Sequence, residues 1–204
     1  MEALATSPRK LEGDKARRIV AAMRDSVGRR GAAGSTFDVV AREAGVSRGL
    51  LHYYFGSKER LLVEVVRTDC DARVAAMEEQ LAAATTIDGI VAVLVQTLEA
   101  IVADEPATQA VVYEMISASR RSDEIRAELA ELYRRWRGQL AEALREKQRQ
   151  GVVELDAEPE AVASMLLALG DGMGVQLISD PDWDGSGTFE LGVATARRLL
   201  GAAG

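Results

Sequence analysis

The length and composition predict an ordinary globular protein that is mostly helical. Its 204 residues are 48% hydrophobic and 28% charged and include only four prolines, which suits one domain with a substantial core or two small ones. The single cysteine, Cys70, excludes an intrachain disulfide and a thiolate metal cluster. The net charge of −7 is unevenly spread: residues 1–60 carry twelve Lys and Arg and seven acids, or +5, which leaves −12 for the rest. This asymmetry is expected of a nucleic-acid-binding module joined to another part, although such a window also arises by chance.

The first predicted helix covers residues 9–30. Apolar residues recur every four positions from Ile19 to Val27, and basic residues occupy the other faces. Gly31 and Gly34 are expected to end this helix.

Two short helices follow, separated by a tight turn. Ser35 or Thr36 caps the first, and Ser35 with Asp38 three residues later has the spacing of a capping box, a stabilisation of about 1 kcal/mol. Gly45 breaks this helix, and Ser47 caps the next.

The residues around the turn suit a helix-turn-helix. Ala41 allows the two helices to approach closely, Gly45 supplies the turn geometry, and Val46 fills the space between the helices. Leu51 is expected to be buried behind the second helix, whose N-terminal end would enter the major groove of DNA.

The remaining segments predict a larger helical bundle. The segment Ile87–Ala103 is apolar on nearly every face, as in a helix buried within a bundle. The helix at 157–179 is punctuated by Gly170, Gly172 and Gly174. We find no convincing strand, so the predicted fold class is all-α with nine helices. The predicted helices after the first span about 35–44, 47–55, 57–84, 87–103, 106–117, 122–150, 157–179 and 187–200.

Two stretches resemble the tetracycline-repressor (TetR) family of bacterial regulators. The run AREAGVSRGLLHYYFGSKERLL looks like the family signature, and the similarity is continuous from Phe37 to Leu62. The segment MLLALGDGMGVQLISDPDWD resembles the eighth helix and following loop of many members, especially the betaine-responsive branch. The resemblance implies a TetR-like fold with a DNA-binding helix-turn-helix domain at 1–56, here called the head. It also implies a ligand-binding and dimerisation domain at 57–204.

The same resemblance assigns the residues that contact double-stranded operator DNA. Arg48 is the best candidate for a base-edge contact because a guanidinium can bind guanine in two places, with a discrimination of about 1–3 kcal/mol. Thr36 and Lys58, at helix starts, would hold phosphates. Tyr54 and Phe55 would pack inside the head. The residues expected to face the groove and adjacent phosphates are Ser47, Arg48, Gly49, His52 and Tyr53.

Two positions depart from the family pattern. Leu50 stands where many members have Thr, and it would either touch a thymine methyl or belong to the core. His52 stands where most members have Tyr, which keeps a hydrogen-bonding ring but changes its reach. A different operator is therefore expected.

By resemblance, the bundle also holds a small-molecule effector, and two copies of the chain pair as a homodimer. Residues 158–178 and 187–200 would form the dimer interface, because their excess of apolar faces would be wet in a monomer. Tyr133 and Trp136 would line the effector cavity or merely fill the core. The candidate ligand-binding residues are Val91, Leu94, Tyr113, Met115, Tyr133, Trp136 and Met173.

Two other classes of protein are less well supported. An enzyme would have to be centred on His52, the only histidine, and no plausible acid–base or nucleophile constellation surrounds it. A helical adaptor would show no salt-dependent affinity for DNA. We expect no catalytic residue, cofactor or metal. The N-terminus lacks a signal-peptide pattern, and no stretch approaches about 18 uninterrupted apolar residues. These features predict a cytoplasmic protein without membrane contact. Separately, we expect a repressor rather than an activator.

Overall fold

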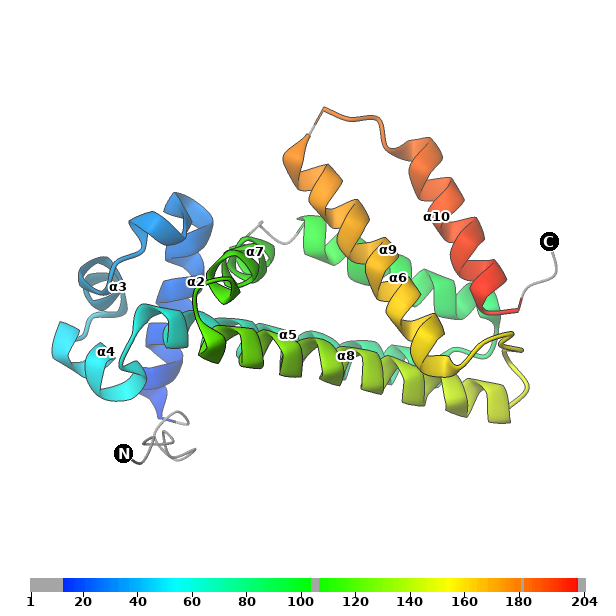
Figure 1. The fold of residues 1–204 in the computed structure, drawn as a ribbon, viewed down its shortest axis with the longest axis horizontal. Helices are drawn as coiled ribbons and strands as arrows, with labels where there is room; N and C mark the ends of the chain where they lie inside the picture. The colour runs from blue at the N-terminus through cyan, green and yellow to red at the C-terminus, as the bar shows by residue number, and fades with distance from the viewer. Residues whose placement is uncertain (1–12, 104–106, 181, 202–204) are drawn as a thin grey trace. The chain divides into compact units, whose positions relative to one another are not determined.

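The computed structural model describes residues 13–103, 107–180 and 182–201, and the regular structure within these ranges is entirely helical (Figure 1). The prediction of an all-α fold is confirmed. The helices in the described ranges are α2 (Asp14–Gly34), α3 (Phe37–Ala44), α4 (Arg48–Phe55), α5 (Lys58–Ala83), α6 (Ile87–Ala103), α7 (Ala107–Ser119), α8 (Asp123–Arg149), α9 (Pro159–Ser179) and α10 (Ser186–Leu199).

The two glycines expected to end the first helix, Gly31 and Gly34, lie in the last turn of α2. The predicted start at residue 9 lies outside the described residues. Gly31 leaves the helical conformation, with φ 70° and ψ 168°, and kinks α2 there, while Gly34, the second glycine expected to end the helix, is its last residue. A glycine has no Cβ and can take this positive φ without a steric penalty, so helical hydrogen bonding resumes after the kink.

Two later helices, α7 and α9, also differ from the prediction. Pro106, the expected start of a short helix, lies outside the described residues, and α7 runs to Ser119 instead of ending near residue 117. In contrast to the punctuation expected from Gly170, Gly172 and Gly174, α9 is continuous from Pro159 to Ser179. Intrahelical hydrogen bonding and the apolar residues that flank the glycines, such as the buried Leu166 and Met173, outweigh the low helix propensity of glycine, about 1 kcal/mol each.

The chain divides into two compact units. The first unit consists of Met1–Cys70 and Glu105–Ala130, and the second of Asp71–Asp104 and Glu131–Gly204. Within the first unit, α2 packs against α3 and α7, and α3 packs against α4. The predicted apolar face of α2 is the centre of this packing, since Ile19 and Met23 are fully buried.

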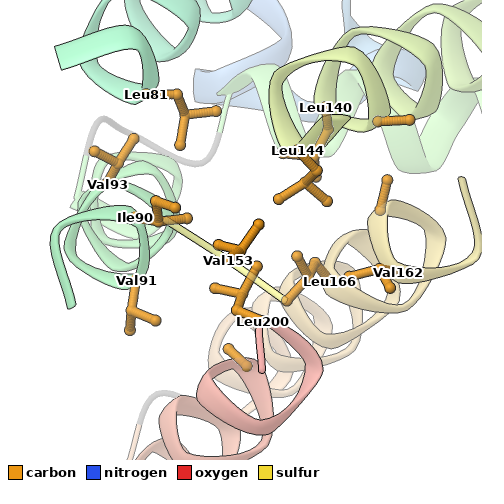
Figure 2. Close-up of a cluster of buried hydrophobic side chains, with 13 residues drawn as sticks. Leu81, Ile90, Val91, Val93, Leu140, Leu144, Val153, Val162, Leu166 and Leu200 are labelled. Atoms are coloured by element: carbon orange, nitrogen blue, oxygen red, sulfur yellow. The ribbon is translucent and has the colours of Figure 1, made fainter. Parts of the chain in front are cut away.

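The second unit has its own core, in which α6 packs against α9 and α10. Figure 2 shows side chains of these helices converging with Leu140 and Leu144 of α8, two members of the apolar stripe predicted for that helix. Among the most deeply buried members of the cluster are Leu81, Ile90, Val162 and Leu200. This core holds α9 and α10, the helices predicted to form the dimer interface, on α6.

Candidate nucleic-acid interface

The turn between α3 and α4 has the geometry expected of a helix-turn-helix. Gly45 ends α3 in the left-handed conformation, with φ 65° and ψ 41°. The backbone N–H of Val46 then donates to the Ala41 carbonyl at 2.9 Å, which satisfies one of the orphan carbonyls at the helix end. Ala41 and Leu51 are buried, as predicted. The sequence therefore fixes the angle at which α4 leaves the turn through local hydrogen bonds and small side chains.

The cap of α3 differs from the predicted capping box. Thr36 is the N-cap, and its Oγ1 accepts a hydrogen bond of 3.4 Å from the backbone N–H three residues later. Ser35 is fully buried, and its Oγ donates to the Gly31 carbonyl at 2.8 Å. The pairing of Ser35 with Asp38 is therefore wrong, because the kinked end of α2 uses the Ser35 hydroxyl. The Asp38 carboxylate instead accepts hydrogen bonds from Arg48.

Helix α4 presents one face to solvent and the other to the core of the first unit. Leu51 and Phe55 are buried, whereas Leu50 and Tyr54 are half-buried. Tyr53 is 58% exposed. The predicted groove-facing residues Ser47, Arg48, Gly49, His52 and Tyr53 are all exposed. The structure thus brings these five residues together on one accessible face.

Several of the predicted DNA-contacting side chains have protein partners. The His52 ring packs edge-on against Phe37, with centroids 4.8 Å apart, and its Nδ1 lies 3.2 Å from the Gly56 carbonyl oxygen. Lys58 Nζ donates to the Ala32 carbonyl, so this lysine also ties the start of α5 to the end of α2. These contacts fix the ring and the ammonium close to the exposed face.

Acidic partners of the head's arginines were not anticipated from the sequence. Glu43 accepts hydrogen bonds from both Arg29 and Arg30, the first at 2.9 Å. Asp38 accepts from Arg48. The spacing of Glu43 and the two arginines, 13 and 14 residues, offers no helical signal, so only the packing of α2 on α3 reveals the contact.

Three of the seven candidate ligand-binding residues line one cavity. Val91, Leu94 and Met173 line an apolar cavity of about 70 Å³ between α6, α9 and α10, which is small beside the roughly 300–1,000 Å³ of most ligand pockets. Tyr113 and Met115 belong to the first unit, where Met115 is 1% exposed.

Tyr133 and Trp136 form a separate aromatic pair in the second unit. Their ring centroids are 5.1 Å apart in an edge-to-face arrangement, and Tyr133 Oη donates to Asp171 Oδ2 at 3.0 Å. Burial raises the pKa of Asp171, and the hydrogen bond from Tyr133 opposes that rise. Asp171, between Gly170 and Gly172, was not predicted; a lone carboxylate in an apolar helix was the signal that could have found it.

Exposed apolar side chains mark the two helices predicted to pair with a second copy. Met165 and Val175 of α9 are 51% and 43% exposed, and Leu191 of α10 is 62% exposed. Helix α9 is long and apolar enough to cross a membrane by length and composition, although only 28% of its most apolar window is buried.

Two protein-family models match most of the chain. Residues 19–65 match the N-terminal model of bacterial regulatory proteins of the tetR family. Residues 91–202, more than half of the chain, match the C-terminal model of BetI-type transcriptional repressors. The chain belongs to the TetR family.

Curated TetR-family relatives are similar over part of their length. The HTH-type transcriptional regulator BetI of Rhizobium meliloti (strain 1021) is 38% identical over 125 residues, which cover 58% of this chain and 59% of the relative. BetI of Agrobacterium fabrum (strain C58) is 48% identical over 50 residues, 24% of each protein. The matched segments thus span less than two thirds of these relatives.

Solved TetR-like structures match nearly the whole chain at low identity. The reduced form of Escherichia coli NemR has a TM-score of 0.76 and 21% identity, and the match covers 94% of this chain and 100% of NemR. The Bacillus subtilis regulator FadR, solved in complex with stearoyl-CoA, has a TM-score of 0.72 and 17% identity over 92% of this chain and 99% of FadR. These matches confirm the predicted TetR-like fold.

Proposed function

We propose that this TetR-family chain is a transcriptional repressor that binds operator DNA as a homodimer and leaves it when a small molecule binds. The observation that carries the proposal is the exposed face of α4, which holds Arg48, His52 and Tyr53 directly after the Gly45 turn. Residues 1–56 would bind DNA, and residues 57–204 would bind the ligand and the second copy. Such a protein acts in the cytoplasm, without an enzymatic activity.

In this proposal α4 lies in the major groove. Arg48 reads a guanine through two hydrogen bonds, while Ser47, Gly49, His52 and Tyr53 contact the groove and neighbouring phosphates. Thr36 and Lys58 hold the phosphates on either side. Because Leu50 is half-buried, its exposed edge would contact a thymine methyl.

The dimer interface is placed on residues 158–178 and 187–200. Exposed Met165, Val175 and Leu191 support this assignment, since a second copy would remove these apolar surfaces from water. Two heads would then reach successive major grooves of a pseudo-palindromic operator, about 34–36 Å apart or at a related spacing.

The effector acts by binding more tightly to the state whose heads do not fit the operator. A ligand with equal affinity for both states would shift nothing. Val91, Leu94 and Met173 support a contact with an apolar part of the effector, because they already line an apolar cavity. Tyr113, Met115, Tyr133 and Trp136 remain candidates for the rest of its site. Failure of every compound class and cell extract to weaken operator binding would contradict this part.

The test is a titration of the protein against the DNA upstream of its own gene and a scrambled fragment, at low and moderate salt. A sequence-specific binder is expected to bind the upstream fragment more tightly, with an affinity that falls as salt rises. If neither fragment is preferred, a random-site selection supplies the operator.

Arg48→Ala should lower the specific affinity about 5- to 150-fold. Arg134→Ala is the matched control, since Arg134 is also an exposed arginine, 62% exposed on α8. The absence of DNA binding at any salt, or equal effects of the two substitutions, would contradict the proposal and favour a protein-binding adaptor.

A further inference from the structure

The guanidinium of Arg48 is held from one side by a carboxylate of the preceding helix. Arg48 is the first residue of α4, and Asp38 lies in the first turn of α3. Arg48 Nη1 donates to both carboxylate oxygens of Asp38, at 3.1 Å to Oδ2 and 3.2 Å to Oδ1. Nη2 and Nε have no hydrogen-bond partner among the described residues. One nitrogen is therefore occupied, and the opposite edge of the guanidinium is open.

This ion pair has little to do with the stability of the fold. The two side chains are 59% and 65% exposed, and exposed ion pairs contribute little to folding because water screens them. Asp38 is also not the cap of α3, a role that Thr36 fills. The ion pair instead restricts the Arg48 side chain, which would otherwise populate many rotamers.

We propose that Asp38 is a specificity-determining residue that positions Arg48 for base reading; this inference rests on the proposed function. With Nη1 held by the carboxylate, the Nη2–Nε edge remains to donate to O6 and N7 of guanine, the two acceptors that this base presents in the major groove. The carboxylate also keeps Nη1 from a DNA phosphate, a competing partner that suits arginine equally well.

This role predicts opposite effects on specificity and on non-specific affinity. Asp38→Ala frees the guanidinium to bind phosphates and removes a negative charge close to the DNA. Non-specific affinity should therefore rise. The preference for guanine should fall, by about 2- to 10-fold, because the side chain is no longer ordered before binding. A residue that only supported the fold would lower both affinities together.

The experiment measures binding to an operator from random-site selection and to a panel in which each base pair is replaced in turn. Wild type is compared with Asp38→Ala and with Asp38→Asn, which keeps one acceptor oxygen and should lie between them. Glu59→Gln is the matched control, because Glu59 is an exposed acid in the first turn of α5 and has no ion pair within the described ranges. It should raise non-specific affinity without changing base preference.

A double-mutant cycle separates positioning from simple repulsion of DNA. In an Arg48→Ala background, Asp38→Ala should produce no further loss of guanine preference. The proposal is overturned if Asp38→Ala leaves the preference unchanged, raises all affinities equally as Glu59→Gln does, or reduces the preference by the same factor without Arg48. If wild type itself shows no sequence preference, the proposed function fails first, and this result is distinct from each of the others.

Discussion

Replacing Lys147 by Met should weaken the second unit through the loss of a buried helix cap. Lys147 lies in the last turn of α8 and is only 3% exposed. Its Nζ donates to the carbonyls of Ala82 and Ala84, at 2.8 and 2.7 Å, and to Gln150 Oε1 at 3.2 Å. No carboxylate among the described residues pairs with it. The lysine therefore uses its three donors on neutral oxygens, two of them at the end of α5.

The expected loss is about 2 kcal/mol, from opposing contributions. Hydrogen bonds that involve a charged group contribute about 1.5–3 kcal/mol each, so the two to the carbonyls at and just after the end of α5 give roughly 3–6 kcal/mol. Burial of the ammonium costs several kcal/mol and cancels part of this. Met fills the space of the lysine stem without burying a charge. The measured change in stability therefore reports mainly that the two carbonyls lose their hydrogen-bond donor.

Thermal unfolding followed by circular dichroism at one fixed protein concentration measures this effect. A loss of about 2 kcal/mol should lower Tm by roughly 4–8 °C in a chain of this length. Arg149→Met is the matched control: it removes a cation from the same turn, but Arg149 is 66% exposed and its partners within the described ranges are Glu142 and Glu146. An exposed pair contributes about 0–1 kcal/mol. A Tm for Lys147→Met equal to or above that of Arg149→Met would refute the reasoning.

Two further predictions concern stability. Gly201→Ala should lower the free energy of unfolding by about 2–4 kcal/mol, because φ is +87° and a Cβ would lie 2.1 Å from the Glu154 carbonyl oxygen. Gly138→Ala, where a Cβ would meet open space inside α8, should instead raise it by about 0.5–1 kcal/mol. Equal Tm shifts for the two variants would contradict both expectations. Because burial raises the pKa of Asp171 above 3.8, its carboxylate lowers stability above the folded-state pKa, and this penalty disappears as pH falls toward 3.8. Asp171→Asn, which keeps an acceptor for Tyr133, should therefore raise Tm at pH 7 but not near pH 4; a gain independent of pH would argue against a buried charge.

The predictable parts of the fold are those determined by neighbouring residues. The αL turn at Gly45 needs only a glycine at the end of a short helix, and Ile19, Met23 and Val27 form one face by spacing alone. For the same reason Ser57 caps α5 as expected, with its Oγ accepting from the backbone N–H three residues later. These features depend on a few consecutive residues, so the sequence pattern suffices to place them.

The unpredicted parts depend on contacts between distant segments. Lys147 follows Leu140 and Leu144 on one helical stripe, but a lysine at that position ordinarily indicates solvent. Its burial is understandable only once the end of α5, more than 60 residues earlier, supplies carbonyl acceptors. Likewise Asp38 lies three residues after Ser35 and satisfies a local capping rule, yet Arg48 is its partner because the turn at Gly45 brings α4 back to the start of α3.

The charge of the head illustrates what a residue count omits. An excess of +5 over residues 1–60 suggests a broad attraction to DNA. Yet Glu43 engages Arg29 and Arg30, which must exchange this partner for a phosphate, and Asp38 engages Arg48. The electrostatic gain per cation is then smaller than in a free basic patch. Recognition depends correspondingly more on the few donors left open on α4, and this is the condition under which one carboxylate, Asp38, can decide which base Arg48 reads.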